Sequence, residues 1–185
     1  MAFTREIVLP DAKPALEWVN GRALQKVSPQ RRHAIAQGRF WGALDAWARE
    51  RGSGEVGTEW EFRIAPPGEV RRPLVPDVAY LSYDRVPFED EEAADIPRVA
   101  PDAVVEVLSP RDRRRDVDEK IRVYLAAGTS VVFVVDTKDE SVMAYELRGS
   151  ERFGPNDVIR HAALPGFSLQ VQRLFERPTP KLREP

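Results

Sequence analysis

The 185-residue sequence contains no cysteine and no hydrophobic run long enough to cross a membrane. Without cysteine, disulfide bonds and thiolate metal sites are excluded, and a reducing compartment suits such a chain. The longest apolar stretch, Val131 to Val135, is far shorter than the roughly 20 residues that span a bilayer. No basic N-terminal segment precedes an apolar run, so the sequence predicts no signal peptide. We therefore expect a cytoplasmic protein that does not contact a membrane.

The sequence also lacks an excess of charge of either sign. Lys and Arg total 28, Asp and Glu total 30, and the formal net charge is −2. This balance excludes the strongly basic surface with which many nucleic-acid-binding domains attract phosphates. Any contact with nucleic acid must then be local. One run of arginines stands out, and it comprises Arg111, Arg113, Arg114 and Arg115.

The beginning of the chain predicts a hairpin followed by a long helix. Asn20-Gly21 between the β-prone runs 16–19 and 22–27 is typical of a β-hairpin, because both turn positions need a positive φ. Ser28-Pro29 predicts the N-cap and the first position of a helix. Apolar residues then recur at helical spacing up to Arg51-Gly52, where the glycine predicts a C-terminal cap.

The middle of the chain predicts an α/β fold. A helix from about Asp112 or Asp116 to Ala127 separates two apolar, β-branched strands, which indicates a βαβ unit with parallel strands and a right-handed crossover. Pro76 indicates a strand start or an edge strand, and the acidic segment 88–95 is typical of a solvated loop. The strand candidates are 56–64, 74–82, 103–108, 131–136 and, as an antiparallel return, 141–147. The length fits one domain, 1–185, with the hairpin and helix at 16–51, the core at 56–147 and a peripheral C-terminal segment at 148–185.

Two carboxylates are unusual because each lies inside an apolar strand. Glu106 interrupts the run from Ala103 to Leu108, and Asp77 interrupts a similar run. Burying an unpaired carboxylate is costly, so each needs a cation, a hydrogen-bond network or solvent at the strand end. If the two strands are neighbours, the acids converge, and a divalent cation would relieve their repulsion. Such oxygen ligands suit Mg²⁺ or Mn²⁺. The alternative is that both acids cap loops at strand ends.

Lys120 is a candidate partner of these acids. It lies about one helical turn into the predicted crossover helix, which follows directly from the strand of Glu106. A long lysine side chain there could reach back over the end of that strand. Asp116 precedes Lys120 by one helical turn, so a surface ion pair between the two is the alternative.

Together these motifs resemble the Uma2 family, which is classed with the restriction-endonuclease-like PD-(D/E)XK nucleases. The similarity covers nearly the whole chain. It rests on Glu17-Trp18-Val19-Asn20-Gly21, Ser28-Pro29, His33, Pro76-Asp77, residues 101–110, Asp116, Lys120, Tyr124, Gly128, residues 132–136 and Leu164-Pro165-Gly166-Phe167. The resemblance implies a restriction-endonuclease-like core, which is a central mixed β-sheet flanked by helices, with an N-terminal β-hairpin.

The resemblance also implies a Mg²⁺-dependent endonuclease that hydrolyses phosphodiester bonds of nucleic acid, DNA in particular. Asp77 matches the aspartate of the family's Pro-Asp motif, and Glu106 matches the acid on the next core strand. They would hold Mg²⁺ or Mn²⁺ with the carbonyl of Val107, and the metal would activate a water. The wider superfamily carries a lysine two residues after the acid, where this chain has Leu108. Lys120 resembles the lysine of the family's following helix, and it would orient the water or stabilise charge on the phosphorane.

Three further residues are candidates for binding the substrate. His33 lies near the start of the long helix, and Arg111 and Arg113 would hold nonbridging phosphate oxygens without reading sequence. The ordinary interpretation is a structural histidine and a solvated helix start.

Three other acids are weaker candidates. Glu17 and Glu59 could face the site, but the polar face of a strand explains them equally well. Asp102 shares strand parity with Glu106 but lies about 13 Å from it, at ~3.3 Å per residue. We expect Asp102 to cap the strand start or to pair with a basic group.

Two alternatives to a nuclease stay open. The first is a non-catalytic nucleic-acid- or protein-binding module that keeps the nuclease fold, which the lack of net basic charge and Leu108 favour. The second is a metal-dependent hydrolase of a smaller phosphate ester. A nuclease of this kind could act as a homodimer.

Overall fold

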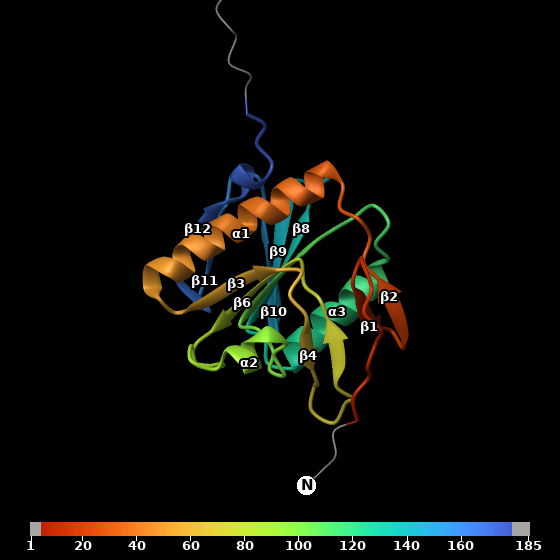
Figure 1. The fold of residues 1–185 in the computed structure, drawn as a ribbon. Helices are drawn as coiled ribbons and strands as arrows, with labels where there is room; N and C mark the ends of the chain where they lie inside the picture. Colours follow the sequence, from red (N-terminus) through yellow and green to blue (C-terminus); the bar gives the residue numbers. More distant parts are fainter. Residues whose placement is uncertain (1–4, 179–185) are drawn as a thin grey trace, which may run out of the picture.

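The computed structural model describes residues 5–178, with one mixed β-sheet at its centre (Figure 1). The strands of this sheet run in the order β10-β9-β8-β7-β6-β3. β7 and β8 are parallel, and the other neighbouring pairs are antiparallel. The strands are β3 (Gly54–Thr58), β6 (Val78–Ser82), β7 (Ala103–Val107), β8 (Val131–Asp136), β9 (Ser141–Glu146) and β10 (Gly149–Phe153). The predicted mixed sheet is confirmed.

Two helices cover the two faces of this sheet. Successive residues of a strand point to opposite faces, so an unbroken apolar strand can supply two core layers. Helix α1 (Arg31–Arg51) belongs to the layer that contains Val105, and helix α3 (Arg114–Ala126) belongs to the layer that contains Val104. The predicted βαβ unit is formed by β7, α3 and β8, and Gly128 follows the helix with φ 110°.

The N-terminal hairpin forms as predicted, with β1 (Leu16–Val19) and β2 (Arg22–Gln25) around a turn at Asn20 (φ 49°) and Gly21 (φ 74°). Its turn is fixed to α3, because the Asn20 side chain donates to Asp116 at 2.8 Å and the Arg22 guanidinium binds the same carboxylate at 2.7 Å. The hairpin therefore lies over the helix that carries Lys120.

The start of α1 differs from the prediction. The helix begins at Arg31 with Gln30 as its N-cap residue, and Ser28 and Pro29 precede it without helical structure. Ser28 and Pro29 instead line a pocket. The C-terminal cap is as predicted, with Gly52 in the left-handed conformation.

Two of the predicted strands are each divided in two. Segment 56–64 breaks at Glu59 (φ 52°) into β3 and β4 (Phe62–Ile64), and segment 74–82 breaks between β5 (Arg72–Leu74) and β6. Strands β4 and β5 pair with each other outside the central sheet. Pro76 lies in the second break, where it has no N–H to donate to a strand neighbour. The break places Asp77 immediately before β6.

The C-terminal segment is not peripheral as far as residue 174. It contains β10, β11 (Val158–His161), β12 (Leu164–Gln170) and a 3₁₀ helix, η1 (Val171–Leu174). The core layer around α1 includes Leu164, Phe167 and Leu174. The prediction failed because these apolar residues are separated by turns and show no sustained periodicity. The end of that predicted segment, 179–185, lies outside the described residues.

A short helix, α2 (Glu91–Asp95), lies within the acidic segment that was expected to be a loop, and the Asp90 side chain accepts from the Ala93 N–H at its start. No helix within residues 5–178 has both the length and the apolarity needed to cross a membrane.

The close contact of β3 and β6 predicts opposite effects at two glycines. A Cβ at Gly54 would overlap the backbone carbonyl of Leu81 and lie 2.7 Å from the Cα of Ser82. Gly54→Ala should therefore lower the free energy of unfolding by about 1–3 kcal/mol. Gly38 lies exposed in α1, where a Cβ meets nothing within 4 Å, so Gly38→Ala should raise it by about 1 kcal/mol. Urea denaturation measures both values, and equal effects would contradict the packing of β3 on β6.

Candidate active site

Asp77 lies immediately before β6 and Glu106 lies on the neighbouring strand β7, which is the arrangement expected for a shared site. β6 and β7 pair antiparallel, with Val78 opposite Val105. Asp77 precedes β6, and its Oδ2 accepts from the backbone N–H of Val107 at 2.7 Å. The Asp77 carboxylate is therefore fixed to the backbone of the strand that carries Glu106.

Asp77 is buried and bears two further partners. The Lys26 ammonium lies 2.7 Å from Oδ1, and His33 Nε2 lies 3.2 Å from Oδ2. Burial raises the pKa of Asp77, but the hydrogen bond from His33 and the Lys26 charge hold it well below its usual range. For Lys26, burial lowers the pKa, but the charge of Asp77 raises it, and the net result lies above the ordinary lysine value. Asp77 is thus ionised at neutral pH.

Glu106 is buried beside Lys120, which α3 directs back over the end of β7. The Lys120 ammonium lies 2.7 Å from Glu106, and the Tyr124 hydroxyl lies 3.3 Å from the same carboxylate. Burial raises the pKa of Glu106 and the Lys120 charge lowers it. The effect of burial is larger, and the resulting pKa is about 8. Burial lowers the pKa of Lys120, and Glu106 and Glu17 more than offset that effect. Lys120 is buried, which excludes a solvated helix face.

Glu17 joins the two halves of the site. From β1, its Oε1 accepts from the backbone N–H of Val75 at 2.8 Å and lies 2.9 Å from the Lys120 ammonium. The break between β5 and β6 leaves this N–H available. Glu17 is buried in the site, where the polar face of a strand predicts an exposed side chain.

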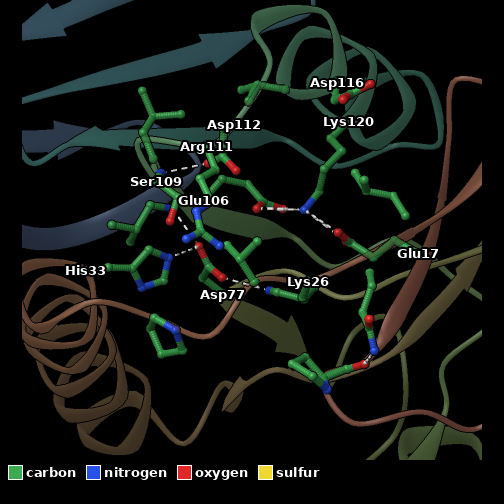
Figure 2. Close-up of a pocket in the computed structure, with 18 of the residues that line it drawn as sticks. Glu17, Lys26, His33, Asp77, Glu106, Ser109, Arg111, Asp112, Asp116 and Lys120 are labelled. Atoms are coloured by element: carbon green, nitrogen blue, oxygen red, sulfur yellow. Dashed lines mark hydrogen bonds and ion pairs between the residues drawn. The ribbon is translucent and has the colours of Figure 1, made fainter.

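These side chains line one pocket of about 560 Å³ (Figure 2). Figure 2 shows Glu106 and Lys120 on one side, Asp77 and His33 on the other, and Glu17 and Lys26 approaching from the hairpin. Arg111 and Arg113 also line this pocket, and both are exposed. The structure therefore brings together Asp77, Glu106, Val107, Lys120, His33, Arg111 and Arg113, which are the site residues named from the sequence.

Two other acids take the roles of ordinary structural residues. Asp102 accepts from the Ser82 N–H at 2.7 Å and pairs with Arg85 at 2.8 Å, which confirms its predicted capping and pairing. Asp116 binds Arg22, and this pair replaces the surface ion pair between Asp116 and Lys120 that was the alternative.

Sequence reasoning missed Lys26 altogether. Lys26 follows β2 and has the same strand parity as Leu24, which is half-buried and contacts the core. That parity was the only signal in the sequence that pointed inward. The partner of Lys26 is Asp77, which lies 51 positions further along the chain, and no local pattern relates the two.

The carboxylate oxygens of this site suit a hard cation that keeps water ligands. No group of three or more acidic or histidine side chains within residues 5–178 is arranged to hold a metal ion. Mg²⁺ commonly uses one or two carboxylates and completes its shell with water and substrate phosphate. Asp77 and Glu106, which line the same pocket, fit that requirement. The contact observed at Val107 is its N–H on Asp77; a role for its carbonyl stays a prediction.

Comparisons with known proteins agree with this arrangement. The model of the Uma2 family, described as "Putative restriction endonuclease", matches residues 6–172. A solved structure described as "a putative nuclease belonging to DUF820" from Anabaena variabilis is 26% identical and has a TM-score of 0.79. The similarity covers 90% of this chain and 93% of that one. No match is found among the curated proteins.

The contact between His33 and Asp77 predicts a pH-dependent contribution to stability. Burial lowers the pKa of His33, but Asp77 raises it above its ordinary value overall. A raised folded-state pKa stabilises the protein at pH values below the unfolded-state pKa, and this stabilisation is lost as pH rises through the folded-state pKa. His33→Gln should therefore cost on the order of 1 kcal/mol at pH 6 and less at pH 9.

Urea denaturation of the wild type and the variant at both pH values measures this difference. In an Asp77→Asn background the effect of His33→Gln should lose its pH dependence. A cost that is constant or larger at pH 9 would show that His33 does not carry charge in this contact.

Proposed function

The chain belongs to the Uma2 family, and on that premise we propose that it is a Mg²⁺-dependent nuclease acting on phosphodiester bonds of nucleic acid, DNA in particular. One observation carries the proposal. Two buried carboxylates from neighbouring strands, Asp77 and Glu106, line one open pocket together with a buried lysine, Lys120. Burial of three such ionisable groups is costly and adds little stability in general, so their presence favours a functional explanation.

The carboxylates of Asp77 and Glu106 would hold the metal. When bound there, Mg²⁺ would polarise a phosphoryl oxygen and lower the pKa of a bound water. Asp77 is preorganised for this task because the Val107 N–H and His33 fix its orientation. Glu106 is fixed by Lys120 and Tyr124.

Lys120 would supply a fixed positive charge beside the scissile phosphate. Its ammonium lies within 3.1 Å of four carboxylate oxygens, two of Glu106 and two of Glu17. A water or a phosphoryl oxygen would replace one of these contacts. Its raised pKa keeps it charged at neutral pH. A preorganised charge in a partly dry site stabilises developing negative charge without reorganisation. Lys120 thereby serves where Leu108 replaces the superfamily's usual lysine.

Arg111 and Arg113 would hold the flanking phosphates. Both lie at the exposed edge of the pocket in the loop between β7 and α3. Neither forms a salt bridge within residues 5–178, whereas the neighbouring Arg114 pairs with Asp118 at 2.9 Å. Their charges are therefore available to an anionic substrate, even though the protein as a whole has a net charge of −2.

Single substitutions at the pocket test the catalytic proposal. Asp77→Asn, Glu106→Gln and Lys120→Met should each lower the rate of Mg²⁺-dependent cleavage by about 100-fold or more. Cleavage of plasmid, linear duplex, single-stranded DNA and RNA with Mg²⁺ or Mn²⁺ is the measurement. Asp118→Asn is the matched control, because it makes the same change on an exposed part of α3, and it should cleave at the wild-type rate.

The result also separates the nuclease from its two competitors. Folded wild-type protein that binds DNA but cleaves no nucleic acid would support the non-catalytic module, which Leu108 and the net charge favour. Cleavage of small phosphodiesters but not of any nucleic acid would support the smaller-substrate hydrolase, for which a pocket of about 560 Å³ is adequate.

Salt dependence tests the role of the two arginines. Each phosphate contact that is lost reduces the slope of log K against log salt concentration by about 1. Arg111→Ala and Arg113→Ala should each weaken DNA binding and reduce the slope in this way. Arg148→Ala removes the same charge from an exposed position outside the pocket. A slope reduced equally by all three variants would place the DNA elsewhere.

A further inference from the structure

Lys26 is a second lysine in the pocket, and its environment differs from that of Lys120. Its ammonium lies 2.7 Å from Asp77 Oδ1, 2.8 Å from the Val75 carbonyl and 3.1 Å from Glu59 Oε2. The side chain is 11% exposed. A lysine ammonium has three hydrogens, and these three oxygens match them. Lys26 as placed therefore has no hydrogen to offer a substrate phosphate, and one of its three partners is a backbone carbonyl, whereas the partners of Lys120 are all carboxylate oxygens.

The other partners of Asp77 restrict where a second cation can bind. Oδ2 accepts from the Val107 N–H at 2.7 Å and from His33 at 3.2 Å. A carboxylate has about four lone-pair positions, so the position that remains lies on Oδ1, which already receives Lys26. A divalent cation at Asp77 would share this oxygen with an ammonium, and like charges so placed repel each other.

Glu59 offers the ammonium a second acidic partner. It lies just after β3 and its side chain is 46% exposed, in contrast to Asp77. Gln37 donates both to Glu59 at 3.2 Å and to the Asp77 carbonyl at 2.9 Å, which holds Glu59 close to the site. If Lys26 releases Asp77, its ammonium therefore still has Glu59 as an acidic partner.

We infer that Lys26 is an internal counter-ion that competes with the divalent metal for Asp77, and that its ammonium, which already contacts Glu59, moves from Asp77 onto Glu59 when the metal binds. The inference rests on the proposed function, because it concerns the metal of the same site. It assigns Lys26 a positioning role and makes it the residue that sets the metal affinity. The Lys26 ammonium also compensates the negative charge of Asp77, so the site is assembled before the metal arrives.

Calorimetric titration with Mn²⁺ in the absence of substrate tests the inference. Lys26→Met keeps an unbranched side chain of similar length and removes the charge. It should bind Mn²⁺ at least tenfold more tightly than the wild type, a difference of about 1.4 kcal/mol. Arg31→Met is the matched control, because it removes the same charge from an exposed position at the start of α1. It should alter the affinity only slightly at physiological salt.

A double-mutant cycle tests the role of Glu59. Glu59→Gln removes the second carboxylate partner of the Lys26 ammonium. In a protein that retains Lys26, this substitution should weaken Mn²⁺ binding several-fold. In the Lys26→Met background the same substitution should have a smaller effect, because no ammonium has to be relocated. Equal effects in both backgrounds would overturn the proposed transfer to Glu59.

The outcomes separate this inference from the proposed function. Wild-type binding that Asp77→Asn abolishes, together with equal or weaker binding by Lys26→Met, would overturn the inference and leave the metal site in place. Absence of Mn²⁺ binding in both proteins, or binding that survives Asp77→Asn, would overturn both. Should Lys26→Met prove unfolded by circular dichroism, Lys26→Gln provides the same comparison.

Discussion

The structure depends on the pairing of buried carboxylates with buried lysines. Asp77 is paired with Lys26, and Glu106 is paired with Lys120, which also contacts Glu17. An unpaired charge in this interior would cost several kcal/mol, so neither the acids nor the lysines can be buried alone. Lys26 and Asp77 are 51 positions apart, and the contact of Lys120 with Glu17 spans 103 positions. The hairpin, α3 and the two central strands are therefore held in place by the same contacts that form the candidate site.

The interrupted strand before β6 is the local feature that makes these contacts possible. A continuous strand from 72 to 82 would use the backbone groups of Val75 for pairing within a sheet. Here the Val75 N–H donates to Glu17 and the Val75 carbonyl accepts from Lys26. Pro76 prevents the ladder from continuing through this point. Irregular backbone at the end of a sheet thereby fixes Glu17 and Lys26, and the hairpin thus contributes to the candidate site.

Much of this arrangement could be predicted from local sequence. Glu106 and Asp77 stand out as charges in apolar runs, and the periodicity around them identifies β7, α3 and β8. The sequence could not reveal Lys26, because its partner is defined only by the tertiary fold. The same reason applies to Glu17, whose partners Lys120 and Val75 are also distant in the sequence. The break at Glu59 was missed because a positive φ at a glutamate has no compositional signal, and Ser28-Pro29 was misplaced because an N-cap pattern also occurs in extended segments that line a pocket.

The central claim is that Asp77 and Glu106 together hold a divalent cation. A crystal structure of the protein soaked with Mn²⁺, with anomalous data collected to locate the ion, tests it most directly. We expect an anomalous peak for a Mn²⁺ ion that both carboxylates bind, with the Lys26 ammonium moved from Asp77 to Glu59. The absence of a peak at these carboxylates in a crystal that binds Mn²⁺ elsewhere would contradict the account.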